Sequence, residues 1–133
     1  MNPARPALML LVDDEEEFAT VMAKRLARRG PHVDTAFSGQ EVVRLARSTE
    51  FDSAVVEIKM EVMDGVETLK TLKMLLPNIK VIMLTGHGSA ENASQGMALG
   101  AYDYLTNPCD IAQLLTSIQQ VLNEGQGPCL AGL

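Results

Sequence analysis

Residues 7–17 read Ala-Leu-Met-Leu-Leu-Val-Asp-Asp-Glu-Glu-Glu, a short apolar run that leads directly into consecutive acidic residues. Because the apolar run has no polar residue at alternate positions, it predicts a β-strand buried on both faces, as in a parallel sheet. Asp14 is then predicted to cap a helix, with Glu17 three residues later and apolar residues at helical spacing beyond it. A strand that runs straight into an amphipathic helix is typical of an α/β fold.

The same alternation of apolar runs and helical segments continues to the end of the chain. Further strands are predicted at His32 to Phe37, Ser53 to Ile58, Lys80 to Leu84 and Ala101 to Leu105. Further helices are predicted after Ser38, which has Glu41 at capping-box spacing, and at Val66 to Leu76, Ser89 to Leu99 and Asp110 to Gly125. Because such crossovers are right-handed, the five strands are expected to form a doubly wound parallel sheet.

Length and charge limit the classes of protein to consider. The chain has 133 residues, which is room for one domain; we place it at residues 7–124, with a flexible tail or linker at residues 125–133. The formal net charge of −6 disfavours direct binding of nucleic acid. The apolar run at residues 7–12 is too short for a signal or membrane segment, so we expect a cytoplasmic protein without membrane contact.

Polar side chains follow the predicted strands at the sheet edge where binding sites of such folds form. Asp13 and Asp14 follow the first strand, Glu57 lies at the end of the third, and Thr85 and Asn107 follow the fourth and fifth. Carboxylates held close together repel unless a cation lies among them, which favours a hard divalent ion such as Mg²⁺. The alternative is that Asp14 only caps a helix and Asp13 faces water.

Several motifs together resemble a response-regulator receiver domain, in order and over roughly residues 7 to 124. They are Leu11-Val12-Asp13-Asp14-Glu15, Phe51-Asp52 through Lys59-Met60, Met63-Asp64-Gly65, Leu84-Thr85-Gly86-His87-Gly88, and Ala101-Tyr102-Asp103-Tyr104-Leu105-Thr106-Asn107-Pro108. The resemblance implies a flavodoxin-like (βα)5 fold with strand order 2-1-3-4-5 and a signalling role, not an enzymatic one, in a two-component phosphorelay. It also implies two partners: a sensor histidine kinase or phosphotransfer protein, and a downstream output protein or fused domain.

The resemblance also implies roles for single residues. Asp13 and Asp14 would help to hold Mg²⁺ together with the backbone carbonyl of Lys59, and Thr85 would hydrogen-bond the phosphoryl group. Tyr104 would change its packing in response. From the residues alone, Tyr104 is equally well a packed core aromatic, and Thr85 a residue that hydrogen-bonds a loop.

Two positions depart from the family pattern: Glu57 stands where the phosphoacceptor aspartate is expected, and Asn107 where a lysine is expected. The longer glutamate moves its carboxylate by about 1 Å, which can cost roughly a hundredfold in rate. Loss of a preorganised donor typically costs about 2.7–4 kcal/mol of transition-state stabilisation. We therefore expect impaired or absent phosphorylation and weak or absent binding of Mg²⁺ by Asp13, Asp14, Glu57 and the Lys59 carbonyl. The alternatives are a functional Mg²⁺-dependent phosphoaccepting regulator and an engineered phosphomimetic variant.

The distribution of charge bears on self-association. No Lys or Arg follows Lys80, whereas residues 81–133 contain Glu91, Asp103, Asp110 and Glu124. Members of the resembling family commonly dimerise through reciprocal salt bridges on the face formed by the fourth helix, fifth strand and fifth helix. We therefore expect a monomer or a dimer without those salt bridges. The cluster Lys24, Arg25, Arg28 and Arg29 is interpreted as a solvated helix end.

Overall fold

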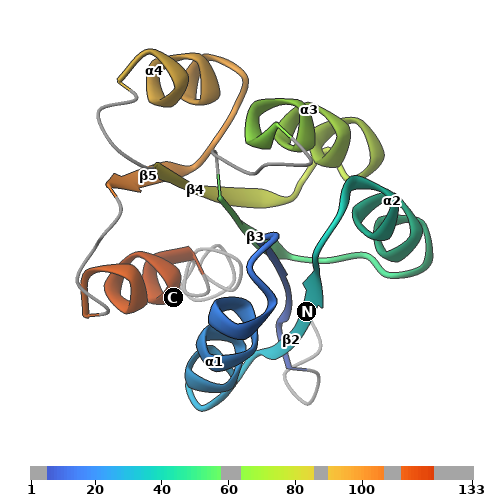
Figure 1. Ribbon diagram of the computed structural model, residues 1–133, viewed down its shortest axis with the longest axis vertical. Helices are drawn as coiled ribbons and strands as arrows, with labels where there is room; N and C mark the ends of the chain where they lie inside the picture. Colours follow the sequence, from blue (N-terminus) through green and yellow to red (C-terminus); the bar gives the residue numbers. More distant parts are fainter. Residues whose placement is uncertain (1–5, 58–63, 86–89, 107–111, 122–133) are drawn as a thin grey trace, which may run out of the picture.

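The computed structural model describes residues 6–57, 64–85, 90–106 and 112–121. A five-stranded parallel sheet has the order β2-β1-β3-β4-β5 (Figure 1). Its strands are β1 (Leu8–Val12), β2 (His32–Ala36), β3 (Ser53–Glu57), β4 (Lys80–Thr85) and β5 (Asp103–Thr106). The helices are α1 (Glu16–Ala27), α2 (Gly39–Ser48), α3 (Gly65–Leu75), α4 (Ala90–Ala98) and residues 112–121. The predicted flavodoxin-like fold and strand order are confirmed.

Two apolar cores lie on opposite faces of the sheet. One joins the sheet to α2 and α3 through residues such as Val42, Leu69 and Leu72. The other joins it to α1 and residues 112–121 through residues such as Met22 and Leu114. Figure 1 shows α2, α3 and α4 along the upper and right-hand side of the sheet, and α1 with the last helix on the lower left side. Burial of both faces explains why β1 and β3 are apolar without alternation.

The strand β5 begins later than predicted, because Ala101, its predicted first residue, is hydrogen-bonded to α4 instead. The backbone N–H of Ala101 donates to the carbonyl of Gly96 in α4 at 2.9 Å, and Gly100 has a φ of 104°. Ala101 therefore closes the end of α4, and the strand begins only at Asp103. Gly96 of α4 is buried against the side chain of Met83 in β4. A Cβ at this position would lie 3.6 Å from Met83 Cε, so the missing side chain lets α4 approach β4 closely.

The helix starts agree in part with the predicted caps. Ser38 Oγ accepts a hydrogen bond from the N–H of Glu41 at 3.2 Å, which confirms the cap of α2. The predicted cap at Asp14 is wrong, because the N-cap residue of α1 is Glu15 and its side chain makes no capping bond. Asp13 Oδ1 accepts from the N–H of Glu15 at 2.9 Å, so the residue before Asp14 binds that amide. None of the helices among the described residues is long and apolar enough to span a membrane.

Candidate functional site

Two buried carboxylates end neighbouring strands at the carboxyl edge of the sheet. Val12 of β1 pairs with Val56 of β3, so the residues that follow, Asp13 and Glu57, lie side by side. Their exposed fractions are only 5% and 6%. Burial of a carboxylate is costly unless a cation, a proton or hydrogen-bond donors compensate it. This pair is the centre of the candidate site.

The environment of Asp13 disfavours its negative charge. Burial raises the pKa of the Asp13 carboxyl above its ordinary value of 3.8, and the nearby charges of Asp14 and Glu15 add to the effect. The hydrogen bond from the Glu15 N–H opposes this shift in the pKa. Because desolvation and repulsion prevail, a bound cation would relieve the carboxylate.

Not all predicted metal ligands are brought together. Asp14 is half-buried beside Asp13, but the described residues contain no group of three His, Cys, Asp or Glu side chains placed to hold a metal ion. The predicted convergence of Asp13, Asp14 and Glu57 on one point is therefore not found there. Lys59 and Asn107 lie outside the described residues, as does the predicted tail at residues 125–133.

The predicted switch residues lie on β4 and β5. Glu57 pairs with Leu84, so Thr85 stands one residue further along the adjacent strand, opposite Thr106 of β5. Tyr104 is 44% exposed, so its interpretation as a packed core aromatic is wrong. The aromatic residue that packs against the core is Tyr102. The Nζ atom of Lys80 lies 5.5 Å from the centroid of the Tyr102 ring.

Two structural contacts were not predicted from the sequence. Asp64 caps α3, because its Oδ1 accepts from the N–H of Val66 at 2.8 Å. The Asp64-Gly65 dipeptide before an apolar periodic segment is a usable signal for such a cap. Asp103 Oδ2 accepts from the hydroxyl of Ser117 at 2.9 Å, a contact between residues fourteen positions apart that no local pattern indicates.

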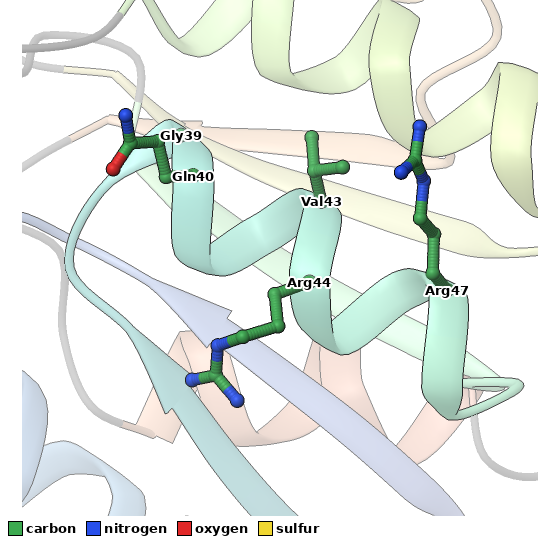
Figure 2. Close-up of a pocket in the computed structure, with 5 residues that line it drawn as sticks. All are labelled: Gly39, Gln40, Val43, Arg44 and Arg47. Atoms are coloured by element: carbon green, nitrogen blue, oxygen red, sulfur yellow. The ribbon is translucent and has the colours of Figure 1, made fainter.

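A separate surface hollow of about 630 Å³ lies on α2 and is lined by Gly39, Gln40, Val43, Arg44 and Arg47 (Figure 2). Figure 2 shows the two guanidinium groups pointing in different directions. Arg44 lies 4.0 Å from the carboxylate of Glu41 on the same helix. The arginines do not form a joint clamp for an anion, so the carboxylate pair remains the candidate site.

The fold and the acidic edge agree with one known family. The family model described as the response regulator receiver domain matches residues 9–119. The chain belongs to this family. The receiver domain is 33% identical over 114 residues to the transcriptional regulatory protein ZraR of Salmonella typhimurium, which covers 86% of this chain and 26% of that protein. It is 34% identical over 102 residues to the photosynthetic apparatus regulatory protein RegA of Cereibacter sphaeroides, covering 77% of this chain and 55% of that protein.

Solved structures of receiver domains superpose closely. A CheY-like receiver domain protein from Methanospirillum hungatei has a TM-score of 0.86 at 29% identity, covering 93% of this chain and 99% of that one. A response regulator from Burkholderia pseudomallei, solved with a phosphorylated aspartic acid, a calcium ion and citrate, has a TM-score of 0.79 at 30% identity, covering 92% and 72%. The receiver domain spans about a quarter of the length of relatives such as ZraR. It is a signalling module of the two-component type.

Proposed function

We propose that this receiver domain acts in the cytoplasm as a signalling module whose phosphorylation by a sensor histidine kinase or phosphotransfer protein is impaired or absent. The observation that carries the proposal is the position of Glu57. It ends β3, is 6% exposed, and lies beside Asp13, where the family pattern has the phosphoacceptor aspartate.

Because Glu57 is buried, its extra methylene relative to aspartate should slow phosphoryl transfer. A carboxylate oxygen that attacks phosphorus must lie in line with the leaving group, and a misplacement of about 1 Å costs roughly a hundredfold in rate. Because Glu57 is enclosed, its longer side chain has little room to retreat from the donor's approach. Asn107 donates hydrogen bonds but carries no charge, so it does not replace the expected lysine in stabilising the transferred phosphoryl group.

The acidic edge also bears on metal binding. Asp13, Asp14, Glu57 and the backbone carbonyl of Lys59 are the groups that would hold Mg²⁺, and hard oxygen donors suit this ion. When bound, Mg²⁺ would neutralise charge around the acceptor. The buried pair Asp13 and Glu57 offers oxygen donors that suit a cation, but the described residues contain no group of three His, Cys, Asp or Glu side chains placed to hold a metal ion. We therefore propose weak binding.

The output of the signal lies outside this domain. Relatives such as ZraR are transcriptional regulatory proteins of which this chain covers about a quarter. We propose that a fused domain or a separate output protein reads the conformation of this receiver domain. The net charge of −6 opposes direct contact between this domain and nucleic-acid phosphates.

Acetyl phosphate with Mg²⁺, followed at once by intact-mass measurement, tests the proposal. We expect no gain of about 80 Da, one phosphoryl group, for the wild-type protein or for the Glu57→Gln control. Glu57→Asp combined with Asn107→Lys should acquire the adduct, and Glu57→Asp alone should acquire it more slowly. A stable wild-type adduct that maps to Glu57 would refute the proposal and favour a functional phosphoaccepting regulator.

A further inference from the structure

The outer face of α1 carries an exposed apolar pair. Phe18 is 37% exposed and Val21 is 55% exposed. Three residues apart on a helix, they are neighbours on its surface. The inner face of α1 is occupied by Ala19, Met22 and Leu26, which pack in the core. The helix therefore has a second, smaller apolar stripe that nothing in the described part of the chain covers.

Charges of opposite sign lie on either side of this pair. Glu16 and Glu17 occupy the first turn of α1, Lys24 and Arg25 the last turn, and Arg28 its C-cap. All five are exposed. Their side chains make no ion pair or hydrogen bond within the described residues, whereas Arg44 and Lys70 on other helices face Glu41 and Glu67. The outer face of α1 thus has an acidic end, an apolar centre and a basic end, all open to solvent.

We propose that two copies of this receiver domain associate through α1, with the two helices antiparallel and a twofold axis at Val21. In that arrangement, residues equally distant from Val21 along the helix face each other. Glu17 lies four residues before Val21 and Arg25 four residues after it, so each Glu17 faces Arg25 of the second copy. Phe18 faces Lys24 of the second copy, whose aliphatic stem covers the ring while its ammonium stays in water.

Self-complementarity is the reason to choose a second copy as the occupant. A twofold interface brings the same patch of both copies together, so the patch must match itself when reversed. The outer face of α1 meets this condition in charge and in its apolar centre. The stretch after Lys80 does not, because it contains no Lys or Arg. Pairing through α1 therefore leaves β5 and α4 open to an output partner.

The size of the contact determines its strength. One helix pair buries less than the roughly 1,200 Å² of a stable specific interface, so the association should be weak and concentration-dependent. Exposed ion pairs weaken as the Debye length falls from about 10 Å at 0.1 M salt to about 3 Å at 1 M. We therefore expect dimer at low salt and high protein concentration, and monomer at high salt.

Sedimentation velocity of the whole chain, from about 20 μM to about 1 mM protein and in low and high salt, measures this directly. Glu17→Arg and Arg25→Glu should each abolish the dimer, because each places two like-charged pairs across the axis. An equimolar mixture of the two variants should restore it, because one copy then has arginine at both positions and the other has glutamate at both. Arg47→Glu on α2 makes the same charge change away from α1 and should leave the dimer intact. Circular dichroism verifies that each variant is folded.

Three results would overturn the proposal: a wild-type monomer at every concentration, a dimer that persists in both single variants, and a mixture that does not restore what the single variants lose. The proposal is independent of phosphorylation, since α1's outer face includes none of the acceptor-site residues.

Discussion

The hydrogen bond between Asp103 and Ser117 should stabilise the contact between β5 and the last helix. Ser117 is 4% exposed, and its hydroxyl donates to Asp103 Oδ2 at 2.9 Å. The other oxygen of Asp103 accepts from the N–H of Tyr104 at 2.8 Å. Hydrogen bonds to charged groups contribute about 1.5–3 kcal/mol, and because Asp103 is only half-buried, we expect this bond to contribute somewhat less, about 1 kcal/mol.

Ser117→Ala should therefore lower the free energy of unfolding by about 1 kcal/mol. Asp103→Ala should cost about 2 kcal/mol, because it also removes the bond to Tyr104 and leaves the buried Ser117 hydroxyl without its acceptor. The double variant should cost about 2 kcal/mol rather than 3, a coupling energy of about 1 kcal/mol.

Urea unfolding at pH 7, followed by circular dichroism, measures these free energies. Thr116→Ala is the matched control, because Thr116 is exposed on the same helix and its hydroxyl donates to the carbonyl of Ala112 within that helix. It should stay within about 0.5 kcal/mol of wild type. If the two single effects simply add in the double variant, the reasoning from this contact is wrong.

Three other predictions concern buried or strained positions. Ser53→Ala should stabilise the fold by about 1 kcal/mol in urea unfolding, because its buried hydroxyl has no hydrogen-bond partner among the described residues; a loss of stability would contradict this. Gly100→Ala should lower the melting temperature more than Gly30→Ala: both glycines have positive φ, but only at Gly100 would a Cβ meet a side chain, Lys73 Cε at 3.3 Å. Because the pKa of Asp13 is raised above 3.8 in the fold, the contribution of Asp13 to stability should fall as pH rises from 3.8 through the folded pKa. In EDTA, the free energy of unfolding of Asp13→Asn should equal that of wild type near pH 3.8 and exceed it at pH 7. Equal free energies of unfolding at pH 7 would show that burial does not penalise the charge of Asp13.

Apolar periodicity was sufficient to predict the order of elements and most of their positions. The reason is physical: β1 and β3 are covered on both faces, so β1 and the central residues of β3 are apolar without alternation. The boundaries were less predictable because individual hydrogen bonds of the backbone, rather than the spacing of apolar residues, fix them. The N–H of Ala101 bonds to Gly96 at the end of α4, and β5 begins two residues later. The N-cap position of α1 is Glu15 rather than Asp14, and Asp13 accepts a hydrogen bond from the Glu15 amide.

The candidate site was predictable in position but not in environment. Parallel register requires that residues directly after paired strands be neighbours, so Asp13 and Glu57 follow from the strands alone. Their burial, with exposed fractions of 5% and 6%, depends on how the rest of the chain packs around the strand ends, which the local sequence does not reveal. The environment of Asp103 was likewise not predictable. The sequence places it among the acidic residues after Lys80, whereas in the fold its carboxylate accepts a hydrogen bond from Ser117.

The direction of the helices adds a reason to expect weak phosphoryl chemistry. Because consecutive strands are parallel, each connecting helix runs back along the sheet, so the last turns of α1, α2 and α3 lie toward the edge opposite to Asp13 and Glu57. Those turns contain the cations Lys24, Arg25, Arg47 and Lys73, whereas the first turns contain acids. This arrangement suits the helix dipoles, but it keeps these cations far from the acceptor. Compensation for a phosphoryl group must then come from Mg²⁺ or from residues outside the described part of the chain, and the sequence has an uncharged asparagine at position 107. Restoring the aspartate alone would leave that deficit, which is why the double replacement at Glu57 and Asn107 should gain more than Glu57→Asp.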